Sequence, residues 1–236
     1  MGDKLTYLTW TEDKAKEIEK NFKDCFDVLG WAFREYGNEI VYACSFGIEG
    51  IVLIDLISKV KKDARVIFLD THLHFKETYE LIEKVKKRYP ALNIKIIEPV
   101  LTLEEQANKF GERLWEREPN ECCHIRKVQP LAEALIEIPA WISGIRREQS
   151  EARRNTNYIN KDVKFQSIKI CPLIDWTLDE IWTYVKLHEL DYNELHDRGF
   201  PSIGCEMCTL PATDPTDERS GRWVQFEKTE CGLHSF

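Results

Sequence analysis

Four of the eight cysteines in this 236-residue chain fall into two close pairs that lie far apart in sequence. Cys122 and Cys123 are adjacent, and Cys205 and Cys208 form a C-x-x-C. Four cysteines in this arrangement are typical of a metal centre, either a structural zinc ion or an iron–sulfur cluster. Because neighbouring side chains tend to diverge, two adjacent thiolates converge poorly on one zinc ion, whereas a four-iron cluster offers each its own iron. The spacing leaves both metals open, with buried, unligated thiols as a third alternative.

Disulfides and a thioredoxin-like site fit these pairs less well. The chain begins without an apolar signal segment, so we expect a cytoplasmic protein, in which thiols are normally reduced. A thioredoxin-type C-x-x-C lies near an early βαβ unit, whereas this one comes late in the chain, after Gly204.

A fifth cysteine, Cys231, lies in the final segment Glu230-Cys231-Gly232-Leu233-His234. Arg219 and Arg222 precede it, and neighbouring cations lower the pKa of a thiol and so supply the nucleophilic thiolate. His234, three residues later, can act in the same way. The pattern indicates redox chemistry in two parts, a fixed metal centre and a mobile nucleophile. Taken alone, the segment is also consistent with a frayed polar terminus.

The elements that must position these residues alternate along the chain. We expect strands at Ile40–Cys44, Arg65–Leu69, Asn93–Ile97 and Ala140–Ser143. We expect helices at Lys14–Phe33, Ile51–Val60, Phe75–Arg88, Leu103–Phe110 and Glu121–Ile136, with a kink or restart at Pro130, and another beginning at Thr177, which forms a capping box with Glu180. Such alternation predicts an α/β fold, a parallel sheet with helices on both faces, and ligands bind at the edge where strands lead into helices.

Two of these strand-to-helix loops carry candidate binding residues. Ser45-Phe46-Gly47-Ile48-Glu49-Gly50 leads into a helix N-terminus, which favours an anion, and Gly47 lets the backbone approach a phosphate or sulfate. An ordinary turn is the alternative. Asp70 and Thr71 follow the next strand, where they either cap a helix or contact a ribose, and capping is the simpler interpretation.

A third loop is rich in arginine. Arg146, Arg147, Arg153 and Arg154 follow Gly144 at the end of the fourth expected strand. Guanidinium groups bind doubly charged anions well, so this density predicts a site for such a ligand. The alternative is a solvated loop whose arginines pair with Glu148 and Glu151.

The net charge and the lengths of the apolar runs argue against nucleic acid and membranes as partners. The formal net charge of −8 argues against general nucleic-acid binding, so an anionic substrate must be met by local basic clusters. No apolar run is long enough to cross a bilayer, so we expect no membrane partner.

Together these motifs resemble the iron–sulfur type of assimilatory adenylyl-sulfate reductase, which shares an adenine-nucleotide α-hydrolase-like fold with the phosphoadenylyl-sulfate reductases. The resemblance extends from about Ile40 to His234 and is carried by Cys122–Lys127, Gly144–Arg153, Gly204–Cys208, Arg219–Trp223 and Glu230–His234. It implies one catalytic domain over residues 1–236, with a nucleotide-binding core over about 1–170 and a C-terminal segment over about 171–236 that holds the C-x-x-C and a redox tail. The loop at Ser45 departs from the glycine-rich, aspartate-containing loop of nucleotide pyrophosphatases.

The resemblance also implies a mechanism. The Cys231 thiolate attacks the sulfur of adenylyl sulfate, AMP leaves, and thioredoxin or glutaredoxin then releases sulfite from the S-sulfocysteine. It places Lys127, Arg219, Arg222 and His234 near the sulfate, and Ser45, Gly47, Glu49, Asp70, Gly144, Arg146 and Arg153 around the substrate. It makes Cys122, Cys123, Cys205 and Cys208 the ligands of a [4Fe–4S] cluster whose role is electrostatic and structural.

Three alternatives remain at this point. A phosphoadenylyl-sulfate reductase, or an enzyme that uses both nucleotides, would need further basic charge for a 3′-phosphate, and Arg147 and Arg154 offer it. Most such relatives lack the two cysteine pairs, which favours adenylyl sulfate. The others are an ATP-consuming thiolase or amidase of the same fold and a zinc-binding interaction protein.

Overall fold

The computed structural model describes residues 4–214 and 216–234, and these residues form a six-stranded sheet in the order β3-β2-β1-β4-β6-β5. The strands are β1 Ile40–Ala43, β2 Arg65–Leu69, β3 Asn93–Ile97, β4 Ala140–Ser143, β5 Ile159–Asp162 and β6 Ser167–Ile170. Neighbouring strands from β3 through β6 are parallel, and β5 pairs with β6 in the antiparallel sense. The predicted α/β class and its four strands are confirmed.

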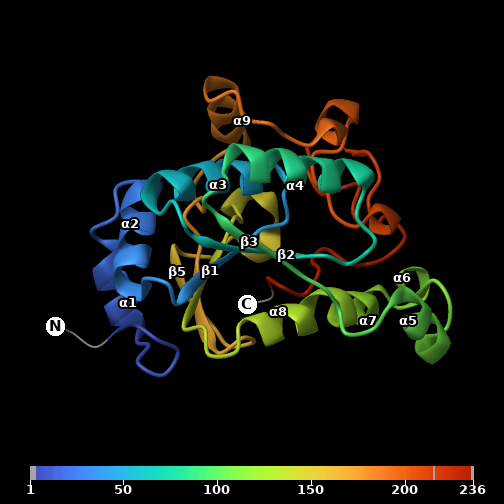
Figure 1. The fold of residues 1–236 in the computed structure, drawn as a ribbon, viewed down its shortest axis with the longest axis horizontal. Helices are drawn as coiled ribbons and strands as arrows, with labels where there is room; N and C mark the ends of the chain where they lie inside the picture. Colours follow the sequence, from blue (N-terminus) through green and yellow to red (C-terminus); the bar gives the residue numbers. More distant parts are fainter. Residues whose placement is uncertain (1–3, 215, 235–236) are drawn as a thin grey trace.

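Helices cover both faces of the sheet, as Figure 1 shows, with α3, α4 and α9 on one side and α7 and α8 on the other. The α-helices are α1 Glu12–Glu19, α2 Cys25–Tyr36, α3 Ile48–Val60, α4 Lys76–Arg88, α5 Leu103–Phe110, α6 Leu114–Arg117, α7 Pro119–Cys123, α8 Gln129–Ala134 and α9 Leu178–Leu187. A π-helix spans His124–Val128, and 3₁₀ helices span Arg147–Gln149, Glu151–Arg153, Glu194–Arg198 and Glu206–Cys208. Among the described helices, none combines the length and apolar character that crossing a membrane requires.

Capping side chains set where several helices begin. The prediction of one helix over Lys14–Phe33 is wrong, because the Asp24 carboxylate accepts the backbone N–H groups of Phe26 (2.8 Å) and Asp27 (3.0 Å) and starts a second helix, α2. The predicted capping box at the start of α9 is confirmed, since the Thr177 hydroxyl accepts the N–H of Glu180 and the Glu180 carboxylate accepts the N–H of Thr177.

The hairpin of β5 and β6 was not predicted from the sequence pattern. Each strand has only four residues, and Lys169 occupies a fully buried position in β6. The Lys169 ammonium lies 5.0 Å from the centre of the Trp141 ring, a cation–π contact that accommodates the charge inside the sheet. A lysine at a buried position breaks the alternation of polar and apolar residues by which a strand is predicted, so β6 has no clear sequence signal.

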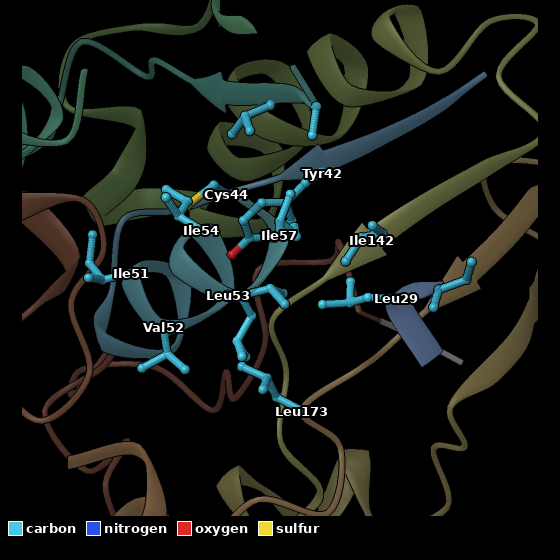
Figure 2. Close-up of a cluster of buried hydrophobic side chains, with 14 of the residues drawn as sticks. Leu29, Tyr42, Cys44, Ile51, Val52, Leu53, Ile54, Ile57, Ile142 and Leu173 are labelled. Atoms are coloured by element: carbon cyan, nitrogen blue, oxygen red, sulfur yellow. The ribbon is translucent and has the colours of Figure 1, made fainter. Parts of the chain in front are cut away.

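The larger hydrophobic core lies between the sheet and the layer of helices that contains α2 and α3. Figure 2 shows Leu29 of α2, Leu53 of α3 and Ile142 of β4 close together in this core. Nearly every side of α3 is buried, because the helix is sandwiched between the sheet and α9. This rigid layer fixes the N-terminus of α3 at the carboxyl end of β1.

A smaller core lies on the opposite face. Val41, Ile67 and Trp141 of the sheet pack there with Leu131 of α8. Leu233, near the end of the chain, packs against the same cluster. The C-terminal tail, residues 229–234, is therefore anchored beneath the sheet, and Figure 1 shows the last described part of the chain, in red, running between the sheet and α8.

Candidate active site

A cavity opens at the carboxyl ends of β1, β2 and β4, the edge predicted to bind ligands. Ser45, Leu69 and Gly144 line it from these three strand ends, and the C-terminal tail forms part of its wall. The residues predicted from sequence that line this cavity are Ser45, Glu49, Lys127, Gly144, Arg153, Arg219, Arg222, Cys231 and His234. Gly47, Asp70 and Arg146 are not among its lining residues. The fold thus gathers residues from both halves of the chain around one space.

Cys231 faces the positive charge that the sequence predicted for it. Burial by itself would raise the pKa of the Cys231 thiol, but Lys127, the Leu233 backbone N–H and Arg219 lower it, and the pKa lies below its ordinary value. Burial disfavours the charged form of Lys127, yet the nearby cysteines, Cys205 first among them, raise its pKa above the usual value. Thiolate and ammonium therefore stabilise each other inside the cavity.

His234 contributes differently from the expectation that it would act as a cation. Burial and the neighbouring cations, Lys169 and Arg153 first among them, hold the pKa of His234 well below its usual range. The imidazole is therefore neutral. It stacks on Trp141 with ring centres 6.2 Å apart and planes 14° apart, and its Nδ1 has no hydrogen-bond partner among the described residues. A neutral ring with an unpartnered nitrogen can donate or accept a hydrogen bond at the cavity wall.

Arg219 and Arg222 reach the cavity from the segment that precedes the tail. Burial, then the charge of Arg153, lowers the pKa of Arg219 to about 10, so its guanidinium is charged at neutral pH. Arg222 lies over the Trp223 ring at 4.5 Å, and a Cβ on Gly204 would lie 2.2 Å from its guanidinium. Glycine at position 204 therefore leaves the space that Arg222 occupies.

The two cysteine pairs meet in a second, small cavity. Cys122, Cys123, Cys205 and Cys208 line it together with Leu73, Pro119, Arg126, Lys127 and Trp223. All eight cysteines of the chain are free of disulfides. Because Lys127 lines both cavities, it joins the four thiols to the space that holds Cys231.

The C-x-x-C loop is held against neighbouring segments by backbone hydrogen bonds. Glu206 N–H donates to the Leu73 carbonyl (2.7 Å), and the Thr71 hydroxyl lies 3.3 Å from Cys205 Sγ. Trp223 N–H donates to the Cys208 carbonyl (3.1 Å). The loop is thereby tied both to the end of β2 and to the segment that carries Arg219 and Arg222.

The first cysteine pair lies where a helix changes its pitch. The predicted helix over Glu121–Ile136 is present as α7 and α8, joined by the π-helix. Within that turn the N–H of Gln129 donates to the carbonyl of His124, five residues back. Pro130 has no N–H to continue the ordinary ladder, which accounts for the irregularity just before it. The wider turn brings Cys122, Cys123 and Lys127 to the same small cavity.

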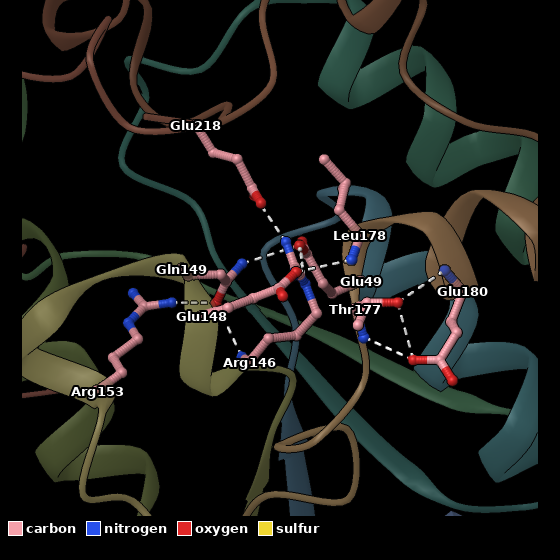
Figure 3. A network of polar contacts seen from close by, with 9 residues as sticks. All are labelled: Glu49, Arg146, Glu148, Gln149, Arg153, Thr177, Leu178, Glu180 and Glu218. Atoms are coloured by element: carbon pink, nitrogen blue, oxygen red, sulfur yellow. Dashed lines mark hydrogen bonds and ion pairs between the residues drawn. The ribbon is translucent and has the colours of Figure 1, made fainter. Parts of the chain in front are cut away.

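Arg146 lies at the centre of a buried polar network, shown in Figure 3. Its side chain is fully buried, and its Nε donates to Glu49 (3.0 Å), Nη1 to Glu148 and Nη2 to Glu218 (2.6 Å). Each guanidinium nitrogen thus already pairs with a carboxylate. Gln149 adds an amide hydrogen bond to Glu49 at 2.8 Å. The network ties the N-terminus of α3 to the arginine loop and to the C-terminal segment.

The loop after β1 differs in detail from the prediction. Gly47 is the N-cap of α3 with an extended backbone, and the left-handed residue is Phe46, with φ of 55°. Glu49 accepts from Arg146 and Gln149, so its charge is compensated. The first N–H groups of α3 have no partner within the helix itself.

Asp70 does not cap α4, so the simpler interpretation of this loop is wrong. The N-cap of α4 is Phe75. The Asp70 carboxylate instead accepts the His72 backbone N–H (2.8 Å) and the Tyr79 hydroxyl (2.7 Å). It stabilises the turn after β2 against α4.

Sequence reasoning assigned no role to three residues of the cavity wall. Gln149 and Glu230 lie within motifs that the sequence singled out, but their polar side chains gave no sign of which partner they meet. Trp141 lies in a predicted strand, and the ring stacked against His234 had no sequence signal of its own. The role of each of these residues depends on a contact with a segment far away in the sequence, which the sequence pattern does not reveal.

The fold and the site together define a class. A mostly parallel sheet with a cation-lined cavity at its carboxyl edge, a thiol of lowered pKa in that cavity and four converging cysteines is typical of an oxidoreductase with an adenine-nucleotide α-hydrolase-like fold. Residues 39–211 match the model of the phosphoadenosine phosphosulfate reductase domain. The chain belongs to this family, as the sequence motifs predicted.

Relatives and solved structures agree with this assignment. The chain is 65% identical over 231 residues to the adenosine 5′-phosphosulfate reductase of Bacillus velezensis, covering 98% of this chain and 99% of that protein. It is 59% identical to adenosine 5′-phosphosulfate reductase 2 of Bacillus subtilis, over 99% of each chain. The crystal structure of a phosphoadenylyl-sulfate reductase from Candida auris in a phosphate complex superposes with a TM-score of 0.73 at 32% identity, covering 86% of this chain and 98% of that one.

Proposed function

We propose that this chain reduces adenylyl sulfate to sulfite and AMP in sulfate assimilation, as a cytoplasmic enzyme and a single catalytic unit. The observation that carries the proposal is Cys231, a thiol with a lowered pKa that faces Lys127 and Arg219 in the cavity. High identity to proteins named adenosine 5′-phosphosulfate reductase over nearly the whole chain supports the choice of substrate.

In the first step, the Cys231 thiolate attacks the sulfur of adenylyl sulfate. The new S–S bond forms as the bond from sulfur to the phosphate oxygen breaks, and AMP leaves with the electron pair of that bond. Lys127, Arg219 and Arg222 offset the repulsion between the thiolate and the anionic substrate. Neutral His234 lines the cavity, where its ring can hydrogen-bond to the substrate.

In the second step, a thiolate of thioredoxin or glutaredoxin attacks the Cys231 sulfur. Sulfite leaves with the electrons of the S–S bond, a mixed disulfide forms, and the second thiol of the partner resolves it to give free Cys231 and an oxidised partner. Both electrons come from the partner's dithiol, so the balance requires no further reductant.

The remaining residues hold this arrangement. Arg153, Ser45 and Gly144 line the cavity around the substrate, and Gly47, which does not line it, starts α3 beside Ser45. Arg146 and Glu49, being paired with each other, support the binding surface through the network described above. Asp70 keeps the turn after β2 in place beside the adenosine.

We propose that Cys122, Cys123, Cys205 and Cys208 ligate a [4Fe–4S] cluster. Burial, followed by the neighbouring thiols, raises the pKa of Cys122 to about 12 and that of Cys208 to about 11, so without a cation these thiols stay protonated. Arg126 Nη2 and Trp223 Nε1 are buried without hydrogen-bond partners among the described residues, and both side chains line the small cavity. Thiolate sulfurs accept such hydrogen bonds around either metal, but a cluster adds its own sulfides as further acceptors for these two donors, which favours the cluster. When bound, the cluster supplies a fixed charge beside Lys127 and a structural anchor.

A substrate with a 3′-phosphate is the second candidate, because the Candida auris relative is a phosphoadenylyl-sulfate reductase. The spare arginines that could meet this phosphate are already paired. Arg147 contacts Asp175, and Arg154 lies 3.0 Å from Glu151. Neither arginine lines the cavity, which favours adenylyl sulfate.

The Cys231→Ser variant tests the nucleophile. We expect it to lose sulfite release while keeping its iron content and its affinity for AMP, because the change removes one thiol and little volume. Normal turnover by this variant would refute the mechanism.

Metal analysis of anaerobically purified protein tests the cluster. We expect brown protein with iron and sulfide in the wild type, and loss of iron in Cys208→Ser and Cys123→Ser, since each removes a ligand. Cys25→Ala, a change at a buried cysteine outside the small cavity, is the matched control. Colourless protein containing zinc would contradict the proposal.

A further inference from the structure

Glu230, the residue before Cys231, has its carboxylate bound by two arginines of the cavity wall, Arg153 and Arg219, and by the nearby Ser150. Arg153 donates from Nε to Oε1 and from Nη2 to Oε2, both at 2.8 Å. The Ser150 hydroxyl donates to Oε1 at 3.0 Å, and Arg219 Nη2 lies 3.4 Å from Oε2. The Glu230 side chain is only 11% exposed. The tail carboxylate is thus held by a bidentate arginine, a hydroxyl and a second arginine.

This set of donors is one that binds tetrahedral oxyanions. A guanidinium that presents two parallel N–H groups recognises phosphate and sulfate as well as carboxylate, and a hydroxyl adds a third bond. The Arg153 side chain is 5% exposed and that of Arg219 is 13% exposed, so their charges are shielded from water. Without an anion between them, the two cations would face each other in a buried place, which is costly. An anion between the two guanidinium groups, here the Glu230 carboxylate, offsets this cost.

We propose that Ser150, Arg153 and Arg219 form an oxyanion site that Glu230 occupies when the cavity is empty, and that a tetrahedral oxyanion displaces it. The inference rests on the proposed function, since the natural competitor is the anionic end of adenylyl sulfate. Glu230 then holds the tail closed in the free enzyme and exchanges places with the substrate anion.

Other contacts keep the tail near the cavity after this exchange. Lys164 donates to the Gly232 carbonyl at 2.6 Å, and Leu233 packs against the core beneath the sheet. Glu230 lies on the other side of Cys231 from these anchors. Its release therefore removes the carboxylate contacts before Cys231, leaving there the hydrogen bond from Arg219 Nη2 to the Thr229 carbonyl (2.7 Å), while the segment after Cys231 stays attached.

Binding of inorganic phosphate to the anaerobic holoprotein tests the competition. We expect Glu230→Gln to bind phosphate on the order of tenfold more tightly than the wild type, because an amide competes for the arginines less well than a carboxylate. Glu227→Gln is the matched control: this exposed glutamate lies three residues earlier, and its change alters net charge equally. A merely structural role for Glu230 would leave phosphate binding unchanged or weaken it.

Hydrogen–deuterium exchange of the tail peptide supplies an independent measurement. We expect phosphate to raise its exchange saturably in the wild type and in Glu227→Gln. In Glu230→Gln the exchange should be high without phosphate and insensitive to it. AMP as a second ligand shows whether the nucleotide's phosphate acts as the free ion does. If Glu230→Gln folds poorly, Glu230→Asp, whose shorter side chain reaches fewer donors, should give intermediate values.

Two results would overturn the inference. One is phosphate affinity in Glu230→Gln no higher than in Glu227→Gln, and the other is tail exchange that phosphate leaves unchanged in the wild type. Neither measurement uses adenylyl sulfate or a reductant. Sulfite release by the wild type tests the reductase proposal separately, so the two can fail independently.

Discussion

Replacing Arg126 with methionine tests how the small cysteine cavity is held together. Arg126 is 1% exposed and lies in the π-helix next to Lys127. Its Nε donates to the Thr71 carbonyl at 2.7 Å, and its Nη1 donates to Gln106 Oε1 at 2.9 Å. One side chain therefore joins three segments that surround the cysteines: the turn after β2, α5 and the π-helix.

The magnitude follows from the acceptors left behind. Methionine fills much of the volume but leaves the Thr71 carbonyl and the Gln106 amide oxygen buried and unpaired. Each unsatisfied acceptor costs about 1–3 kcal/mol, and the relief of a buried cation offsets part of the total. We expect a loss of about 2–4 kcal/mol in the free energy of unfolding, or about 5–10 °C in Tm for a chain of this length.

Urea unfolding of the anaerobic holoprotein, followed by far-UV circular dichroism, measures this loss. Arg34→Met is the control, because Arg34 is exposed on α2 and its change should stay within about 0.5 kcal/mol. Arg126→Lys keeps a charge but makes fewer bonds and should fall between the two. An Arg126→Met midpoint equal to that of the control would show that these hydrogen bonds do not stabilise the fold.

Three further predictions concern the reaction. Lys127→Ala, Arg219→Ala and Arg222→Ala should each slow S-sulfocysteine formation by about 10²- to 10³-fold in single-turnover assays, and wild-type rates in all three would show that the charges face solvent only. Because Lys127 and Arg219 outweigh burial and lower the Cys231 pKa, the thiolate persists below the ordinary thiol range, so the first-step rate should fall only on acidification through the lowered pKa. Lys127→Met should move this fall to higher pH, and an unmoved profile would contradict the assignment. Side-by-side assays should give a higher kcat/KM for adenylyl sulfate than for its 3′-phosphorylated form, and the reverse preference would identify a phosphoadenylyl-sulfate reductase.

The local pattern of residue types was sufficient to predict the strands at the edge of the sheet where the cavity lies. The runs Arg65–Leu69, Asn93–Ile97 and Ala140–Ser143 match β2, β3 and β4 in both bounds, because β-branched and aromatic residues bounded by polar turns leave little choice of structure. The carboxyl edge then follows from parallel pairing alone. That edge is where Ser45 and Gly144 were expected, and where they lie.

The carboxylate partner of each arginine could not be predicted from the sequence. Arg146 and Arg153 belong to one loop, yet Arg146 pairs with Glu218, 72 residues away, and Arg153 with Glu230, 77 residues away. The number of arginines in the loop predicts a cluster of positive charge. Which of these arginines forms an ion pair with a carboxylate depends on how the distant segments fold together. The same long-range contacts place the tail in the cavity.

The π-helix before Pro130 has a consequence for how this helix tolerates insertions and deletions. One residue corresponds to about 100° of rotation in an ordinary α-helix. A single extra residue in one turn therefore rotates the side chains before that turn by about this angle relative to those after it. Here the shift lies between Cys123 and α8, whose Leu131 is fixed in the core beneath the sheet. Deleting one residue of the turn would restore regular pitch and rotate the cysteine pair away from its partners. The π-helix thus rotates α7 relative to α8. As a result Leu131 faces the core beneath the sheet while Cys122 and Cys123 face the small cavity.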